Sequence, residues 1–545
     1  TRFPVGRVLR HLSWRAALAL VAFAACGAPG AANVSAPVVR DHPAFPGASA
    51  EAARPPAATA DGPHVDAAPR LAQDPFAERV IGRCLVGKDG APDLRFLLLH
   101  TNDLQARYSE RLGGKSRFAR LAGALAAERA TTPNVLVLDG GDAYEKGSFA
   151  ETLSSGEATR EALQLLPFDA RVIGNHDFAW GREQVLRDVS QSRFPVLAAN
   201  IQYVPVEGKP ASENPFLPYV RYRVGCVKVA VLGLVTAGFD ARDEQAKGPY
   251  DTVFVHDDRY ATIAKGLVEK LRPDADVIIA LDHLGLFPDS QLAQRVPGID
   301  IFISSHTEEF LENPNPVWRA DGRMGYLVEA GHWTRAFGRG TVVVGPKSVS
   351  FENYKLVRLT EQTPVDDEVE KGVAAIEAKY APKLNETIVS VGKTIPLIDL
   401  PGLVRDAFRS EEGVDGVLIG GDTFFGPIAK GPATPQSLFE TFFIQREPAG
   451  TSGFTSLWKG TFTGAQLLEL KSRVRGGNLR MFLPSPLVKD ANYSIGISKR
   501  LREHPDVFFN APPPLPATSF VGEQIDLVFR YAKRRAAAGK TLDGP

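Results

Sequence analysis

The sequence lacks several features that would assign it to a functional class at once. It has only 3 cysteines in 545 residues, and no CxxC pair or His/Cys cluster indicates structural zinc. Lys and Arg number 63, as do Asp and Glu, so the formal net charge is zero. No whole-molecule field therefore attracts nucleic acid or an anionic membrane, and we expect no nucleic-acid partner. There is no evident internal repeat, so repeat architectures are excluded.

The N-terminus has the pattern of an export signal. An apolar run at 16–25 follows a segment with four arginines and is too short to span a bilayer. We predict a signal peptide over residues 1–26 and a protein exported to the periplasm or cell envelope. Small residues before Cys26 resemble a bacterial lipoprotein cleavage box. Lipid anchoring at Cys26 and simple cleavage both stay open, and that anchor is the only membrane contact we expect.

The segment 27–75 is rich in Ala and Pro and poor in aromatic residues. It has too little apolar surface to offset the entropy of ordering, so it is predicted to be a disordered tether. Beyond it lie Cys84 and Cys226. An oxidising compartment permits their pairing, but spacing alone does not predict a disulfide, and two separate thiols stay the alternative.

Short apolar runs alternate with helical patterns through the first half of the chain, which indicates repeated βα units and a largely parallel, buried sheet. A chain of this length exceeds one hydrophobic core, so at least two domains are expected. We predict an α/β domain over 90–350, a connecting helix within 362–385 and a second domain over 386–545. The predicted strands centre on residues 96–99, 135–138, 172–173, 196–198, 229–232, 277–280 and 299–303.

Metal-ligand residue types follow several of these strands, often beside glycines that let the backbone approach closely. Such a set suits a two-metal centre, in which a carboxylate bridges two cations and an open position accepts a phosphoryl oxygen. Asp142 follows two glycines and is the natural bridge. Asn175, His283 and His306 complete one metal, while Asp103, Gln105 and Glu308 surround the other.

In order, these motifs resemble the calcineurin-like metallophosphoesterases, and within them the bacterial 5′-nucleotidase and UDP-sugar hydrolase type. The resemblance implies an α/β fold, a metallophosphoesterase β-sandwich flanked by helices (α-β-β-α), followed by a smaller α+β substrate-recognition domain. It also implies that His176 faces the phosphoryl group and assists the leaving group. The segments that carry it are His100-Thr101-Asn102-Asp103, Gly140-Gly141-Asp142, Gly174-Asn175-His176-Asp177, Asp282-His283-Leu284-Gly285 and Ser305-His306-Thr307.

Three positions depart from the family pattern. The family has histidine where this chain has Gln105 and Glu308, and it has an aspartate that orients the catalytic histidine where this chain has Ala179. Oxygen ligands favour hard cations. We therefore predict two divalent ions: a His-containing site for Zn²⁺, Mn²⁺ or Fe, beside a weaker oxygen-rich site for Mn²⁺, Mg²⁺ or Ca²⁺.

The predicted function is hydrolysis of a small-molecule phosphate ester by a metal-bound hydroxide. The resemblance implies a phosphomonoester, a nucleotide or a nucleoside diphosphate-sugar. The base-clamping segment of the family is not found, and core packing is the expected role of Phe424 and Phe425. Two alternatives stay open: a catalytically impaired envelope binding protein, motivated by the three departures, and a sulfur-ester hydrolase on the same scaffold.

Overall fold

The structure is a computed structural model that describes residues 74–145, 147–203, 216–236, 252–254, 257–420, 424–442, 456–475 and 479–543. The predicted signal peptide and all but the last two residues of the predicted tether lie outside these residues. The described residues belong to one compact unit, Ala68–Pro545. Among the helices that the structure describes, none combines the length and the apolar character needed to cross a bilayer.

The first sheet has six strands in the order β17-β16-β2-β5-β6-β7. Its four strands from β2 to β7 are parallel, and β16 and β17 add an antiparallel edge. The bounds are β2 (Arg95–Thr101), β5 (Val135–Asp139), β6 (Ala170–Val172), β7 (Val196–Leu197), β16 (Ala336–Val344) and β17 (Val349–Arg358).

The second sheet has seven strands in the order β1-β9-β10-β12-β13-β15-β14. Here β10, β12, β13 and β15 are parallel, while β9 and β14 pair antiparallel with their neighbours. The βα units are therefore divided between two mixed sheets instead of forming one parallel sheet. The bounds are β1 (Arg79–Ile81), β9 (Tyr219–Val224), β10 (Val227–Val235), β12 (Val277–His283), β13 (Ile301–Ile303), β14 (Asn315–Trp318) and β15 (Met324–Val328).

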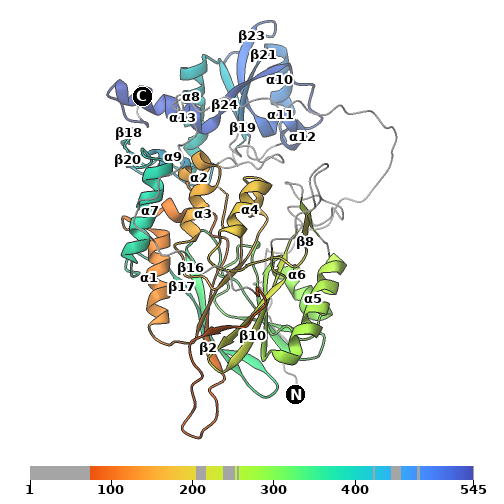
Figure 1. Ribbon diagram of the computed structural model, residues 1–545. Coiled ribbons are helices and arrows are strands. Elements are labelled where there is room, and N and C mark those ends of the chain that lie inside the picture. The colour runs from red at the N-terminus through yellow and green to blue at the C-terminus, as the bar shows by residue number, and fades with distance from the viewer. Residues whose placement is uncertain are drawn as a thin grey trace, which may run out of the picture. The chain divides into compact units, whose positions relative to one another are not determined.

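Both faces of each sheet are buried, because alternate residues of a strand point to opposite sides. Leu98 packs in the core between the two sheets, whereas Leu97 and Leu99 pack in a core under helices. On the second sheet, Ile279 packs in the core between the sheets, and Ile278 packs in a core under helices. Figure 1 shows α1 (Arg117–Arg129), α3 (Glu157–Leu163) and α7 (Asp367–Tyr380) apart from α5 (Asp257–Leu271) and α6 (Leu286–Arg295).

The layers are thus helix, sheet, sheet and helix, and the predicted fold class is confirmed. The α7 helix lies within the predicted connector 362–385 and packs on the first of these layers. Its Val369, Val373 and Ile376 share a core with α1. Asp366 caps it by accepting hydrogen bonds from the backbone of Glu368 and Val369.

A five-stranded sheet in the order β22-β19-β23-β21-β24 forms the core of the C-terminal part. Val417 and Leu418 of β19 enter different hydrophobic cores, so this sheet also has two buried faces. Its elements are β19 (Gly416–Gly420), β21 (Ser456–Thr463), β22 (Leu479–Phe482), β23 (Asn492–Ser498), β24 (Thr518–Glu523), α8 (Leu400–Glu412), α9 (Pro435–Phe439), α10 (Gly464–Ser472), α11 (Lys499–Glu503), α12 (Pro505–Phe508) and α13 (Gln524–Ala537).

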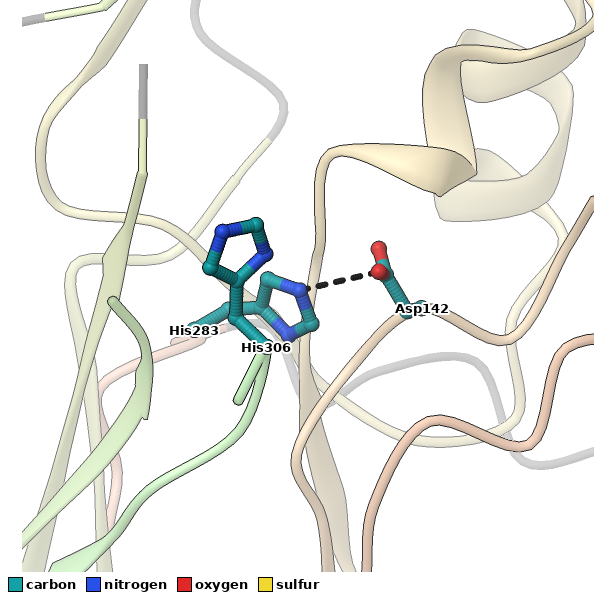
Figure 2. Close-up of side chains that lie close together, drawn as sticks. All are labelled: Asp142, His283 and His306. Atoms are coloured by element: carbon teal, nitrogen blue, oxygen red, sulfur yellow. Dashed lines mark ion pairs between the residues drawn. The ribbon is translucent and has the colours of Figure 1, made fainter. Parts of the chain in front are cut away.

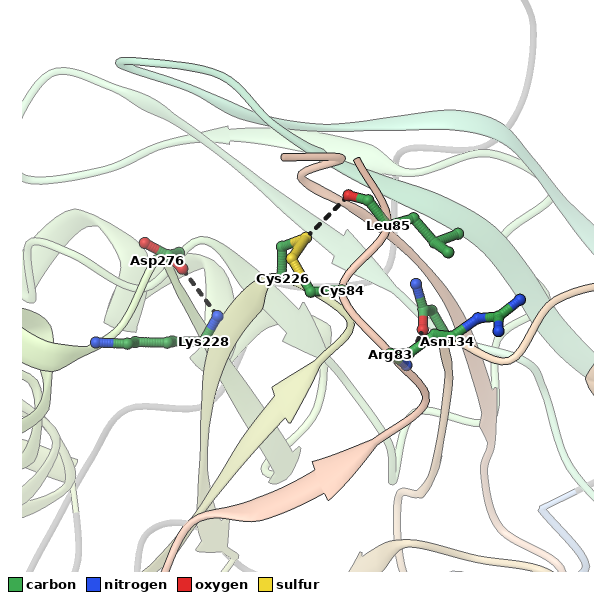
Figure 3. Close-up of a disulfide and its surroundings, with 7 residues drawn as sticks. All are labelled: Arg83, Cys84, Leu85, Asn134, Cys226, Lys228 and Asp276. Carbon is green, nitrogen blue, oxygen red and sulfur yellow. Dashed lines mark hydrogen bonds between the residues drawn. A yellow bond between two sulfur atoms is a disulfide. The ribbon is translucent and has the colours of Figure 1, made fainter. Parts of the chain in front are cut away.

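Cys84 and Cys226 form a disulfide, with a Cα–Cα distance of 4.3 Å across a sequence separation of 142 (Figure 3). Cys84 follows β1, and Cys226 lies in the turn between β9 and β10. The structure therefore has the paired form of the two alternatives. Disulfides persist in oxidising compartments and are rare where thiols are kept reduced.

Candidate metal centre

Side chains from the ends of five parallel strands meet at one place, as expected for the carboxyl ends of strands in α/β sheets. Three of these strands belong to the first sheet and two to the second. The two sheets are linked here by a hydrogen bond from the Asn102 side chain, after β2, to the Ser304 carbonyl, after β13, at 2.6 Å. The residues concerned are Asp103 after β2, Asp142 after β5, Asn175 and His176 after β6, His283 at the end of β12, and His306 after β13.

Asp177 holds two of these loops together. Its Oδ2 accepts hydrogen bonds from the backbone N–H of Asp142 at 2.9 Å and of Gly174 at 2.6 Å. Its carboxylate also pairs with Arg171, which is fully buried and reaches Asp188 at 3.1 Å. This buried network places Asp142 beside Asn175, and the sequence motif alone does not reveal it.

Two glycines are needed here because the loops approach so closely. A Cβ atom on Gly140 would lie 1.9 Å from Ser305 Oγ, and one on Gly174 would lie 2.1 Å from Asp142 Oδ1. Any side chain at either position would push the loops apart. The glycines therefore permit the backbone approach on which the site depends.

His283 is oriented by a backbone carbonyl. Its Nδ1 lies 2.8 Å from the Gly140 oxygen, which can only accept, so Nδ1 carries the hydrogen. Its Nε2 lies 3.0 Å from Asp142 Oδ2 and 3.1 Å from Asn175 Oδ1. A lone pair on Nε2 thus faces two other acceptors, and only a positive charge, a proton or a metal cation, satisfies all three. A carbonyl behind the ring is the usual support of a metal-binding histidine.

His306 completes this group, since its Nδ1 lies 3.0 Å from Asn175 Oδ1. Ligand atoms of Asp142, His283 and His306 all lie within 4.8 Å of one another, and Figure 2 shows the two imidazoles beside the carboxylate. We call Asp142, Asn175, His283 and His306 the histidine side of the site. Its two imidazoles, carboxylate and amide oxygen match the ligands of zinc, manganese or iron.

The charges of the histidine side are coupled. Burial alone would lower the pKa of His283, but the carboxylates of Asp142 and Asp103 outweigh it and raise that pKa to about 10. Burial would raise the pKa of Asp142, but His283 and His176 lower it below its usual range. In the absence of a metal, a proton on His283 therefore supplies the positive charge that stabilises the Asp142 carboxylate.

Asp103 lies beside the histidine side. Its Oδ2 accepts from the backbone N–H of His306 at 3.3 Å, and its Oδ1 is 4.0 Å from His283 Nε2. Within the described residues this buried Oδ1 accepts no hydrogen bond. Burial raises the pKa of Asp103 well above its usual value, with His283 opposing and Asp142 adding to the rise. An orphaned carboxylate oxygen here fits a second cation next to Asp142.

Gln105 and Glu308 have hydrogen-bond partners already. Gln105 Nε2 donates to Glu308 Oε1 at 2.8 Å, and Gln105 Oε1 accepts from the Trp333 indole at 2.7 Å. The oxygen that would bind a metal is therefore engaged by an N–H group. We call Gln105, Glu308 and Trp333 the glutamine side of the site.

Trp333 of the glutamine side contacts two arginine side chains and a phenylalanine of the C-terminal part. The guanidinium carbons of Arg107 and Arg335 lie 4.2 and 4.6 Å from its ring centre. The Phe425 ring meets it edge-on at 5.4 Å and is 37% exposed, whereas Phe424 is buried. Core packing, the expected role of both phenylalanines, therefore describes Phe424 but not Phe425.

His176 begins the short helix η2 (His176–Phe178), and its side chain is 24% exposed. Its backbone N–H donates to Asp142 Oδ1 at 2.7 Å, and its Nε2 lies 3.7 Å from Asp142 Oδ2. Its Nδ1 contacts the Glu145 carboxylate. The sequence motifs did not identify Glu145 as a site residue, because no fixed spacing along the chain relates it to His176.

Backbone strain is concentrated around the site. Of the twelve described non-glycine residues with positive φ, nine lie in the loops that carry or adjoin it. Such conformations are costly and persist where the surrounding structure enforces them, typically at functional sites. The nine are Asp103, Gln105, Ala106, Asp142, Glu145, His306, Glu308, Trp333 and Thr334.

A family model described as calcineurin-like phosphoesterase matches residues 96–309, the segment that contains every residue of the histidine side. Residues 96–309 form a calcineurin-like phosphoesterase domain. Human 5′-nucleotidase is 29% identical over 359 residues, which cover 61% of this chain and 60% of the human protein. The chain thus spans less than two thirds of that relative's length. The resemblance to 5′-nucleotidases drawn from the motifs is confirmed.

Two solved structures share the fold of the chain around this phosphoesterase domain. The 5′-nucleotidase precursor of Thermus thermophilus matches with a TM-score of 0.59 and 20% identity, covering 81% of this chain and 96% of that one. The sulfate thiohydrolase SoxB of Thermus thermophilus matches with a TM-score of 0.56 and 19% identity, covering 82% and 94%. The same scaffold therefore occurs in proteins named for phosphorus and for sulfur substrates.

Proposed function

We propose that this chain is a metal-dependent hydrolase of small-molecule phosphate esters: phosphomonoesters first, then nucleotides or nucleoside diphosphate-sugars. The observation that carries the proposal is the convergence on His283 Nε2 of Asp142 Oδ2 at 3.0 Å and Asn175 Oδ1 at 3.1 Å. Three acceptors at these distances fit around a cation. The phosphoesterase domain and the 5′-nucleotidase relatives support the reaction class.

In this proposal the first cation is held by Asp142, Asn175, His283 and His306. Asp103 and Asp142 hold the second, since Asp103 Oδ1 is buried without a hydrogen bond among the described residues. Gln105 and Glu308 can bind the second cation only if they give up the hydrogen bonds that link Gln105 to Glu308 and to Trp333. The second site is therefore the weaker one and, with its oxygen ligands, suits Mn²⁺, Mg²⁺ or Ca²⁺.

Bound divalent ions in such a centre activate water and neutralise the charge of the phosphoryl group. The chain's own residues supply the rest. Gly140 holds the hydrogen on His283 Nδ1 and so keeps Nε2 turned toward the site. Asp177 fixes the loop that carries Asp142. His176, beside Asp142 and partly exposed, donates a proton from its ring to the departing alcohol oxygen.

Metal analysis and an ester panel test this function. Purified full-length protein, stripped of metal and reloaded with Zn²⁺, Mn²⁺, Mg²⁺ or Ca²⁺, is expected to bind divalent ions and to hydrolyse aryl phosphates. A parallel set of sulfate and thiosulfonate esters is expected to stay intact. Absence of both metal binding and phosphate release would falsify the proposal, and turnover of the sulfur set alone favours the sulfur-ester alternative.

A second candidate is an envelope binding protein without turnover. The observation in its favour is the glutamine side, where the polar groups of Gln105 already pair with Glu308 and Trp333. One bound metal with no hydrolysis supports this reading. Two equivalents of metal with measurable turnover support the enzyme.

We also propose that the protein is exported, either with a lipid anchor at Cys26 or after simple cleavage of the signal peptide. The N-terminal pattern of residues 1–26 supports export, and so does the Cys84–Cys226 disulfide, since such bonds need an oxidising compartment. Expression of the full chain in a bacterium with labelled fatty acid tests it. Label on the wild type but not on Cys26→Ser supports the lipid anchor, whereas an unlabelled, exported wild type supports simple cleavage.

A further inference from the structure

Glu145 lies next to the ring on which the proposed function depends. It follows Asp142 by three residues, in the loop after β5, and is 8% exposed. Its Oε2 contacts Nδ1 of His176. A carboxylate only accepts, so the hydrogen of this bond is on Nδ1, and Nε2 is the atom turned toward Asp142 at 3.7 Å.

The position of Glu145 is itself fixed from behind. Its backbone N–H donates to Glu151 Oε1 at 2.9 Å. Glu151 is fully buried in α2 (Phe149–Ser154) and also accepts from Thr159 Oγ1 and Trp180 Nε1, each at 2.6 Å. Glu145 has φ +67°, a strained value that this support maintains. The carboxylate is therefore held toward His176 by packing and hydrogen bonds.

Ala179 supplies no partner for the His176 ring. It is the third residue after His176, where the family resemblance implies an orienting aspartate, and the residue is buried. It has no polar side-chain atom, so it leaves the tautomer of His176 unspecified. The acidic partner comes instead from the neighbouring loop.

We propose that Glu145 is the positioning residue of His176: it accepts the hydrogen on Nδ1 and so turns Nε2 toward the site. The donating ring carries hydrogen on both nitrogens; Nε2–H goes to the departing alcohol oxygen, and Nδ1–H stays hydrogen-bonded to Glu145, which leaves the neutral Nδ1–H ring. The inference rests on the proposed function, in which His176 protonates the departing alcohol. Glu145 acts through the ring and does not itself touch substrate.

The first test reads the tautomer without any substrate. In full-length protein labelled with ¹⁵N-histidine, the His176 signal is assigned by its loss in His176→Ala. We expect Nδ1–H in the wild type and Nε2–H in Glu145→Ala, because the ring then loses its acceptor at Nδ1. The same tautomer in both proteins overturns the proposal.

The second test uses two esters that differ in their need for a proton. Loss of assistance should lower kcat about 100-fold on glycerol phosphate, whose alcohol leaves poorly. The change on 4-nitrophenyl phosphate should stay within about 3-fold, because its phenolate leaves without a proton. KM and metal content should change little. Equal losses on both esters, or loss of metal, indicate a merely structural role and overturn the proposal.

Three further variants keep the test decisive. Glu145→Gln preserves the volume, so it reports the charge if Glu145→Ala folds poorly. The double variant Glu145→Ala, Ala179→Asp should regain at least part of the lost activity on glycerol phosphate. Glu183→Gln, an exposed residue of α4 (Arg182–Ser190), is the matched control and should behave as the wild type. If the wild type hydrolyses neither ester, the proposed function fails. The tautomer measurement then still tests whether Glu145 holds the hydrogen on His176 Nδ1.

Discussion

The histidine side and the glutamine side of the site lie next to each other but satisfy their polar groups differently. On the histidine side, His283 Nε2 faces Asp142 and Asn175 oxygens at 3.0 and 3.1 Å, so acceptors meet acceptors. On the glutamine side, each end of the Gln105 amide already has a partner of the opposite kind. A cation completes the first arrangement and must disrupt the second. The difference therefore predicts two ion sites of unequal affinity.

Removing the charge of the histidine side should have the largest effect. In Asp142→Asn, the oxygen beside His283 is kept in shape but loses its negative charge. We expect metal affinity to fall by at least about 100-fold, the loss that even residues behind metal ligands cause, and activity to fall with it. Atomic absorption on the purified variant measures this. Retention of full metal content contradicts the assignment of Asp142 as a ligand.

The buried network behind the histidine side is the next most sensitive point. Arg171→Ala leaves Asp177 and Asp188 buried without their cation, and breaking such a pair costs about 3–5 kcal/mol of the free energy of unfolding. Urea denaturation checks the prediction, with the exposed pair Lys371–Glu368 as a control, where Lys371→Ala should leave the free energy of unfolding nearly unchanged. Equal effects of the two variants would remove the structural role given to Asp177.

Restoring imidazoles on the glutamine side should make the two sides alike. The double variant Gln105→His, Glu308→His places nitrogen ligands where the resemblance implies them. We expect its zinc content to rise to about two equivalents, whereas the wild type holds about one tightly. Calorimetric titration with Zn²⁺ gives the stoichiometry. A second tight site already present in the wild type contradicts the inequality of the two sides.

The smallest effect is expected from Trp333→Phe. An aromatic ring is kept, but the indole N–H that donates to Gln105 Oε1 is lost. Releasing one neutral hydrogen bond should strengthen the weaker ion site by about 2- to 10-fold. Mn²⁺ titration of the variant measures this change. An unchanged affinity indicates that Gln105 takes no part in ion binding.

The fold was predictable to the extent that apolar periodicity determines it. The run Phe96 to Leu99 predicts β2, and alternate burial of Leu97 and Leu98 follows from a strand that is covered on both faces. The periodicity does not tell which strands pair. The division of the βα units between two sheets therefore came only from the family resemblance and from the structure.

Some residues of the site could be predicted from the sequence and others could not. Asp142, Asn175, His283 and His306 could be named because they follow strands within recognisable motifs. Glu145 could not, since its contact with His176 depends on the left-handed backbone of one loop. Nor does the sequence show that Trp333, far along the chain, occupies the Gln105 oxygen. Single contacts between distant loops carry no periodic signal.

The Cys84–Cys226 disulfide has a mechanical consequence. If residues 27–75 are a tether to a membrane, any pull on the domain enters through the segment that leads to β1. The covalent link passes this tension directly from Cys84 to the turn between β9 and β10, inside the seven-stranded sheet. The covalent path from Cys84 to Cys226 thus bypasses the intervening chain, which carries Asp103, Asp142 and His176.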